Sequence, residues 1–253
     1  MHRYLMEEMT WPEIKEALEK GYRTVIICTA SIEQHGPHLA ELTDSAIGEA
    51  SAVDLAKRLG DALVAPVIRP GLSSHHMKLP GSLTLRPEVF TGIVEDYVTA
   101  YKSHGFEKVV LLSSHGGNLK VLEEIAANLR FKYPALKIVT GLPLSKMLEL
   151  LKKMEGSESL QPGACGGHAC DYETSVMLYL YPKHVRMDQA EAGYVGSLSE
   201  ILVDRVFKEG ITAISPSGVM GDPSSANALR GSRFFEKVQL ALYESVLAGF
   251  AEM

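Results

Sequence analysis

The sequence predicts an α/β fold, a single-domain, three-layer α/β/α sandwich around a mostly parallel sheet. Short, continuously apolar runs rich in β-branched residues alternate with longer stretches of helical pattern. Such a β-α-β-α order builds parallel sheets through right-handed crossovers. The length of 253 residues allows one large domain, and no composition break or internal repeat marks a second one. We therefore expect residues 1–253 to form one domain.

The expected elements follow one another along the chain. Thr10 and Glu13 have the spacing of a capping box, and Pro12 suits the first turn of a helix that starts there. The strands are continuously apolar, which predicts helices on both faces of the sheet. The Gly-rich stretch 156–168 predicts a long loop over the active face. The expected strands are TVIICTA (24–30), ALVAPVI (62–68), KVVLLSS (108–114) and LKIVTGL (136–142), and the expected helices cover about 45–59, 87–104, 118–131, 171–181 and 231–250.

Composition excludes several classes of protein. The net charge of −6 comes from scattered charges without a basic stripe, which argues against nucleic-acid binding. No apolar run reaches the roughly 18 residues needed to span a bilayer, and the N-terminal residues lack the apolar core of a signal peptide. Three cysteines are too few for a disulfide framework. We expect a cytoplasmic protein with a small-molecule substrate and no membrane partner.

Polar segments that carry histidines follow three of the expected strands. SIEQHGPHLAELTD (31–44) comes after the first strand, SSHHMKLPG (73–81) comes after the second, and SHGGN (114–118) directly follows the third. In open parallel sheets, ligands bind outside the carboxyl ends of the strands. We therefore expect the three segments to converge on one rim and to form a site.

The first and third segments supply the candidate metal ligands Glu33, His35, Asp44 and His115. Glu33 and His35 are two residues apart, so in an extended segment their side chains point to the same side. Taken alone, each has a plainer explanation: Asp44 could cap a helix, and His115 could lie in an ordinary strand-to-helix turn. The glycines after His115 let the backbone approach whatever occupies the rim.

A further segment, GACGGHACDYETS (163–175), adds His168 and Glu173. Glu173 lies in the first turn of an expected helix, where an acid also interacts favourably with the helix dipole. Cys165, His168 and Cys170 could in principle hold a structural zinc, but no second Cys/His pair lies nearby to complete four ligands.

Together these side chains are the ligand mix of divalent ions such as zinc, manganese or iron. An Asp that bridges two ions, with a His and a Glu on either side, is a common arrangement in binuclear hydrolases, and Asp44 is the expected bridge. Two such ions lower the pKa of a shared water and polarise a substrate carbonyl. His168 would carry the proton from the attacking water to the leaving nitrogen.

Four segments in order resemble the signature segments of the creatininase (creatinine amidohydrolase) family: SIEQHGPHL…TD, SHGGN, GGHACDYETS and GVMGDPSSA. The resemblance implies a single α/β domain, two divalent metal ions per chain, hydrolysis of amide-type bonds and a homo-oligomer, often a hexamer. His168 falls on the catalytic histidine of the family, and Glu173 falls on the acid that follows it. The implied metal ligands are Glu33, His35, Asp44, His115 and Glu173.

The chain departs from the members that hydrolyse creatinine. Gly117 stands where those members have a metal-ligating glutamate, so either Glu173 supplies that carboxylate or the second ion binds weakly. Trp11 is the only tryptophan, and the aromatic walls that enclose creatinine are missing. Their stacking is worth on the order of 1 kcal/mol per ring contact. We expect a small cyclic amide, a formamide or a related carbonyl compound instead, with His76, Gly117 and Asn118 as substrate-binding residues.

Two other functions stay open at this point. A hydrolase that opens an oxidised inositol ring, of the 3-dehydro-scyllo-inosose type, would also present a carbonyl to the same chemistry. A non-catalytic ligand-binding protein that kept the fold would be expected to have lost ligands, whereas all the candidate ligands are present. Elemental analysis of the purified protein distinguishes an enzyme with about two ions per chain from a binding protein with none.

Overall fold

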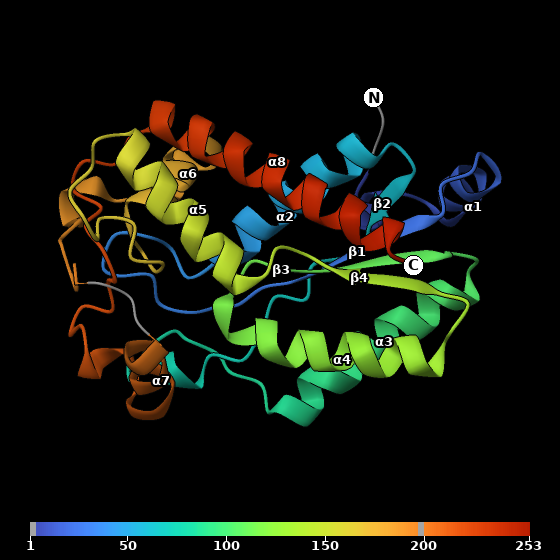
Figure 1. The fold of residues 1–253 in the computed structure, drawn as a ribbon, viewed down its shortest axis with the longest axis horizontal. Coiled ribbons are helices and arrows are strands. Elements are labelled where there is room, and N and C mark those ends of the chain that lie inside the picture. Colours follow the sequence, from blue (N-terminus) through green and yellow to red (C-terminus); the bar gives the residue numbers. More distant parts are fainter. Residues whose placement is uncertain (1–3, 197–199) are drawn as a thin grey trace.

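The centre of the molecule is a four-stranded parallel sheet in the order β2-β1-β3-β4 (Figure 1). The structure is a computed structural model that describes residues 4–196 and 200–253. Thr24 pairs with Ala62 and with Lys108. The strands are β1 (Thr24–Thr29), β2 (Ala62–Val64), β3 (Lys108–Ser113) and β4 (Lys137–Thr140).

Eight α-helices surround the sheet in the described part of the chain. They are α1 (Trp11–Glu19), α2 (Thr43–Leu59), α3 (Pro87–Ser103), α4 (Leu119–Lys132), α5 (Leu144–Ser157), α6 (Asp171–Leu180), α7 (Glu200–Glu209) and α8 (Ala228–Ala251).

The side chains of β1 divide the core into two layers. Val25 and Ile27 pack in one cluster with residues of α3 and α4, whereas Ile26 and Cys28 pack in another with residues of α2 and α8. This alternation follows from the two-residue period of a strand. Figure 1 shows α3 and α4 on one face of the sheet and α2, α5, α6 and α8 on the other. The three-layer α/β/α prediction is confirmed.

The predicted elements are present, and two helices were missed. The capping box of α1 is confirmed, with the Thr10 backbone N–H donating to the Glu13 carboxylate at 2.6 Å. β2 is shorter than predicted, because after Val64 the chain only touches β1 at isolated points. The long loop begins after Ser157 rather than at residue 156, since α5 runs to that residue. Neither α5 nor α7 was predicted.

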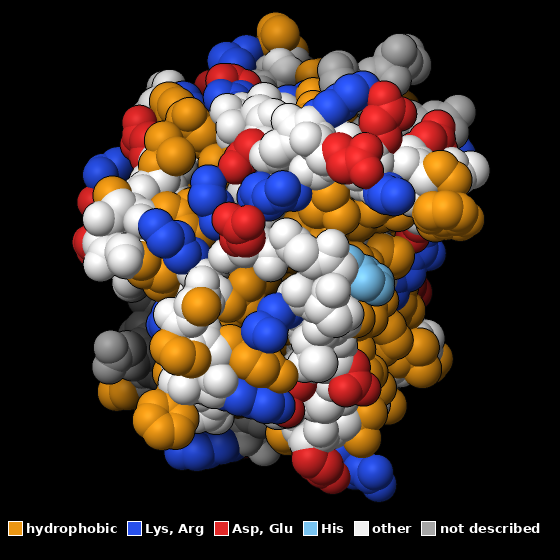
Figure 2. All heavy atoms as spheres, turned by 90° about the vertical axis from the view of Figure 1, so that its right-hand side faces the viewer, with side chains coloured by type: hydrophobic (Ala, Val, Ile, Leu, Met, Phe, Trp, Pro, Cys, Tyr) orange, Lys and Arg blue, Asp and Glu red, His pale blue; other side chains and the backbone are white. Residues whose placement is uncertain are grey.

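The structure agrees with two expectations from the composition: the absence of a membrane-spanning helix in the described residues and the scattered surface charges (Figure 2). None of the helices in the described residues is long and apolar enough to cross a bilayer. Figure 2 shows the end of the molecule that carries α1 and both termini, where acidic and basic side chains are intermixed with apolar ones. The one-domain organisation and the cellular location stay predictions.

Candidate metal centre

The predicted site residues converge beyond the carboxyl ends of β1 and β3. Two lie in the loop after β1, one lies in the first turn of α2, one lies two residues after the end of β3, one lies in the loop before α6, and one lies in the first turn of α6. Five of them are buried, and the side chain of the sixth, His168, is 13% exposed. In that order they are Glu33 and His35, Asp44, His115, His168 and Glu173.

Asp44 lies at the middle of the cluster, between two histidines. Its Oδ1 lies 3.3 Å from His35 Nε2, and its Oδ2 lies 3.2 Å from His115 Nδ1. His115 Nδ1 is also 3.2 Å from Glu33 Oε1. Each oxygen of one carboxylate therefore faces a different histidine, which is the arrangement expected of a bridging ligand.

The donor atoms fit divalent cations. Glu33 Oε1, His35 Nε2 and Asp44 Oδ2 are buried and have no hydrogen-bond partner among the described residues. A buried polar atom without a partner costs free energy, and a bound ion would satisfy all three at once. Potential ligand atoms lie within 4.8 Å of one another in three overlapping groups: Glu33, His35 and Asp44; His35, His168 and Glu173; and Glu33, His76 and His168.

The second ring nitrogen of each histidine is held by a backbone carbonyl. His35 Nδ1 lies 3.0 Å from the carbonyl oxygen of Glu33, and His115 Nε2 lies 3.1 Å from that of Leu72. A nitrogen that donates its proton to a carbonyl leaves the opposite nitrogen with a free lone pair. This hydrogen bonding turns His35 Nε2 and His115 Nδ1 toward Asp44.

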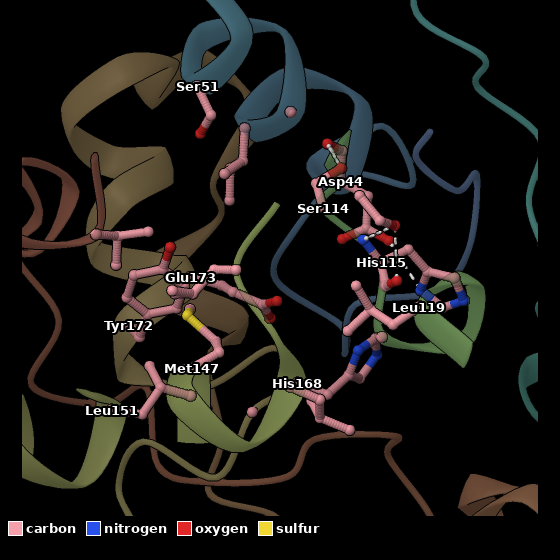
Figure 3. Close-up of a pocket in the computed structure, with 18 of the residues that line it drawn as sticks. Asp44, Ser51, Ser114, His115, Leu119, Met147, Leu151, His168, Tyr172 and Glu173 are labelled. Carbon is pink, nitrogen blue, oxygen red and sulfur yellow. Dashed lines mark hydrogen bonds and ion pairs between the residues drawn. The ribbon is translucent and has the colours of Figure 1, made fainter. Parts of the chain in front are cut away.

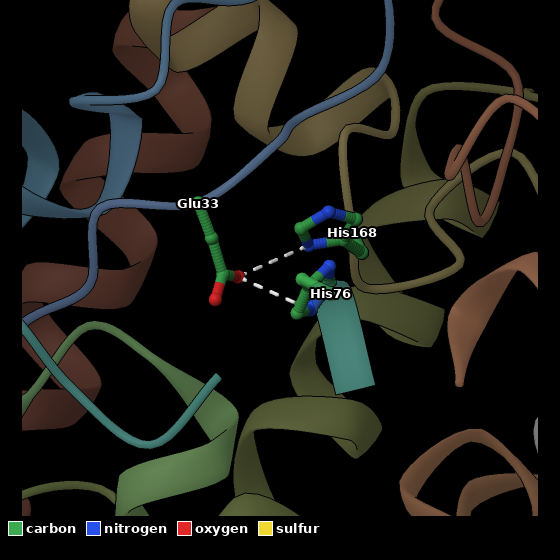
Figure 4. A group of neighbouring side chains, drawn as sticks. All are labelled: Glu33, His76 and His168. Carbon is green, nitrogen blue, oxygen red and sulfur yellow. Dashed lines mark ion pairs between the residues drawn. The ribbon is translucent and has the colours of Figure 1, made fainter. Parts of the chain in front are cut away.

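Gln34, which was not among the predicted site residues, connects two further histidines to the cluster. Gly36 N–H donates to Gln34 Oε1 at 3.0 Å, so the amide nitrogen faces His76 Nδ1 at 2.7 Å. His76 then carries its proton on Nε2, which lies 3.3 Å from Glu33 Oε1. His168 Nε2 lies 2.8 Å from the Gln34 carbonyl, and its Nδ1 is 3.7 Å from Glu33 Oε1 (Figure 4).

The charges of the cluster favour a cation at its centre. Burial would raise the pKa values of Glu33 and Asp44, but the neighbouring histidines hold both below their usual range. Burial would lower the pKa of His35, yet the Asp44 carboxylate raises it to about 10, and Glu33 and Asp44 likewise raise the pKa of His115. Burial, opposed by His35, raises the pKa of Glu173 to about 7. Protons on two histidines thus occupy the place that metal cations would take.

The predicted substrate-binding residues differ in their positions. His76 and Gly117 line a cavity next to the cluster. Asn118 is fully buried, accepts from Leu72 N–H at 2.9 Å and donates to the Ala30 carbonyl at 3.0 Å. Asn118 therefore supports the loop that holds His115, and its role toward substrate stays a prediction.

A cavity with two apolar lobes opens from the cluster. The first lobe, about 160 Å³, runs beneath α5 and is named the α5 lobe. The second lobe, about 140 Å³, runs beneath α7 and is named the α7 lobe. Figure 3 shows Met147, Leu151 and Tyr172 across the α5 lobe from Asp44 and His115. Both lobes are lined by Glu33, His115, Gly116, Leu144, Leu148, Gly167 and His168.

Comparisons with known proteins agree with this architecture. The chain is 31% identical over 219 residues to the mycofactocin precursor peptide peptidase of Mycolicibacterium smegmatis, which covers 85% of this chain and 80% of the relative. It is 29% identical to the creatinine amidohydrolase of Pseudomonas putida, covering 72% and 74% of the two chains. A solved structure described as "Creatininase Mn" superposes with a TM-score of 0.83 at 22% identity, over 98% of this chain and 99% of that one.

The family match extends over nearly the whole sequence. Residues 7–246 match the family described as "Creatininase: Creatinine amidohydrolase", and this range contains every side chain of the cluster. The predicted resemblance is thereby confirmed. The chain belongs to the creatininase family of hydrolases.

Proposed function

We propose that this chain is a metal-dependent amidohydrolase that holds two divalent ions on either side of Asp44. The observation that carries the proposal is the placement of the two Asp44 oxygens, one beside His35 and one beside His115. A buried ion pair needs only one cation beside the carboxylate. Here two imidazoles face Asp44, and the other nitrogen of each is hydrogen-bonded to a backbone carbonyl, which is the usual second contact of a histidine that binds a metal.

Each ion would have three ligands from this chain. Glu33, Asp44 and His115 would hold one, and His35, Asp44 and Glu173 would hold the other. Zinc, manganese or iron bound there would polarise a substrate carbonyl and lower the pKa of a water molecule. Ser31 supports the first set, because its hydroxyl donates to Glu33 Oε2 at 2.9 Å and leaves Oε1 free for the ion.

His168 is the proposed proton carrier. Burial, together with the charge of nearby His35, lowers its pKa to about 3, so the imidazole is neutral at pH 7. Its Nε2 is occupied by the Gln34 carbonyl, which leaves Nδ1 directed to the cluster. A proton taken by Nδ1 from the attacking water would pass to the leaving nitrogen. His76 lies beside the Glu33 carboxylate, with its Nε2 3.3 Å from Oε1.

The substrate class follows from the cavity and from the relatives. The names of the relatives concern a peptide and creatinine, and both substrates contain an amide-type carbonyl. The cavity has apolar lobes and no tryptophan, which argues against creatinine. Beyond the cluster the lining is mainly aliphatic, which favours an apolar substrate over a ring with many hydroxyls and makes the oxidised inositol the weaker candidate. We propose a small, largely apolar amide, a class that includes the cyclic amides and formamides predicted from the sequence.

Metal analysis combined with an activity screen tests the proposal. The purified protein, reconstituted with zinc, manganese or iron, should hold about two ions per chain and release amine from members of a panel of lactams, formamides and short peptides. Asp44→Ala should lose both ions and all turnover, whereas Asp54→Ala, a change in the same helix away from the cluster, should lose neither.

Two outcomes would contradict the proposal. Reconstituted protein without bound metal would support the non-catalytic binding protein instead. Full activity of Asp44→Ala would remove the bridge from the mechanism. A homo-oligomer, which the family resemblance implies, stays a prediction that light scattering on the purified protein would check.

A further inference from the structure

The two lobes of the cavity lie on different sides of one polar cluster. Met147, Leu151 and Val238 line only the α5 lobe, and Val206, Phe207 and Met220 line only the α7 lobe. The lobes meet at Glu33, His115 and His168, where the proposed chemistry takes place. A substrate whose scissile bond lies at this junction has one lobe available for each side of the bond.

The chemistry of the walls is apolar on both sides. Outside the metal cluster, the described lining of the α5 lobe is mainly aliphatic, with Tyr172 and three serines, Ser51, Ser113 and Ser114, as its polar side chains. The described lining of the α7 lobe combines aliphatic side chains with His75, His76 and Phe207, and neither lining contains a lysine or arginine. An anionic group would be desolvated in either lobe without a cationic side chain to pair with, at a large cost, and a cationic group would find carboxylates only at the cluster itself. An apolar group would be removed from water at no such cost.

The size of the lobes matches groups of about six carbons. An apolar cavity of roughly 150 Å³ is large enough to hold benzene. The two lobes, at about 160 and 140 Å³, bracket this volume. A small lactam joins both sides of its amide in one ring, so it could occupy only the junction or one lobe.

We propose that the preferred substrate is an open-chain amide that carries an apolar group of about six carbons on each side of the scissile C–N bond. One group enters the α5 lobe and the other enters the α7 lobe. The inference rests on the proposed amidohydrolase function and narrows its substrate class. Hydrolysis breaks the C–N bond, transfers OH from water to the carbonyl carbon and H to the nitrogen, and releases a carboxylic acid and an amine.

Two methionines report on the lobes independently of turnover. Met147 lines only the α5 lobe and Met220 lines only the α7 lobe. In metal-free protein labelled with methyl-¹³C methionine, N-benzyl-phenylacetamide should shift the methyl signals of both residues. N-methyl-phenylacetamide and N-benzylacetamide, with one large group each, should shift one signal each, and the two amides should affect different methionines. Unmoved signals, or equal shifts of both methionines with 2-pyrrolidone, would overturn the inference.

Kinetics with the metal-loaded enzyme supply the second test. Replacing a methyl group by a benzyl or isoamyl group on either side of the amide should raise kcat/KM roughly 10- to 100-fold. Met147→Ala should weaken the preference on one side of the amide only, and Phe207→Ala should weaken it on the other side only. Phe131→Ala, a change at a phenylalanine that is 91% exposed, is the matched control and should alter neither preference.

The failures of the two proposals can be told apart. If the loaded enzyme hydrolyses amides but prefers lactams, charged groups or methyl groups, the two-lobe inference is wrong and the amidohydrolase assignment stands. If loaded protein hydrolyses no amide at all, the amidohydrolase assignment fails and the inference fails with it.

Discussion

Arg230→Met tests the buried ion pair that holds the start of α6, the helix that carries Glu173. Arg230 Nη1 lies 2.7 Å from Asp171 Oδ2, and the Asp171 side chain is 0% exposed. Ser175 and Ser225 also donate to the Asp171 carboxylate, at 3.2 and 3.1 Å. The substitution keeps much of the side-chain volume and removes the only cation paired with Asp171 among the described residues.

The magnitude follows from what Asp171 can do without its partner. It can at worst take up a proton, and protonating a carboxyl of ordinary pKa at pH 7 costs about 4 kcal/mol. Breaking a buried pair by removing one partner typically costs about 3–5 kcal/mol, and the two serine hydrogen bonds remain. We expect a loss of about 2–4 kcal/mol in the free energy of unfolding. For a chain of this length that lowers Tm by roughly 4–16 °C.

The loss should depend on pH in a defined direction. Burial raises the pKa of Asp171, and Arg230 opposes this rise, so removing Arg230 raises the pKa further. A carboxyl whose folded pKa lies above its unfolded value binds more protons in the folded state. Its folded state therefore loses stability as the pH rises through the unfolded pKa toward the folded one. The deficit of the variant should be largest near pH 7 and should shrink as the pH approaches 4.

Thermal and urea unfolding of the metal-free protein between pH 4 and 7 measure this effect. Arg233→Met is the matched control, because Arg233 lies in α8 like Arg230 but is 44% exposed in its pair with Glu158, and it should change the stability far less. Arg230→Met combined with Asp171→Asn should recover much of the loss. A deficit below about 1 kcal/mol, or one that grows as the pH falls, would refute the reasoning.

Three further predictions concern the site and the thiols. Gly117→Ala should lower the metal content toward one ion per chain, because a Cβ there would lie 2.4 Å from both His115 Nε2 and the Leu72 carbonyl; an unchanged metal content would contradict this. His168→Ala should keep its ions and lose turnover by about 10²–10⁴, whereas loss of metal would make His168 a ligand. The three buried cysteines, of which Cys28 has its pKa raised to about 12 by burial, should not react with a disulfide reagent at pH 8 until the protein is unfolded, and rapid labelling of the native protein would count against their burial.

The fold was largely predictable because the strands and most helices have strong patterns. The continuous apolar runs gave all four strands, and the capping box gave the start of α1. α5 was missed although Leu144, Met147, Leu148 and Leu151 have the spacing of one helical face. The predicted loop began at Gly156, so it overlapped only the last two residues of this helix. α7 has only ten residues, and its apolar side chains line the cavity rather than extend a core that the sequence pattern would indicate.

The residues of the site were predictable, but the hydrogen bonds that orient them were not. Glu33 and His35 were expected on one side, and they do belong to one group of potential ligands. Gln34, which lies between them in the sequence, was not among the predicted site residues, yet its amide reaches His76. Which ring nitrogen faces the cluster depends on carbonyls such as that of Leu72, far away in sequence. Contacts of this kind are set by tertiary packing and leave no local pattern.

Anomalous diffraction from crystals soaked in manganese or zinc would locate the bound ions. We predict two peaks flanking the Asp44 carboxylate, one beside Glu33 and His115 and one beside His35 and Glu173. A single peak elsewhere in the chain, or no peak at this carboxylate under saturating metal, would contradict it.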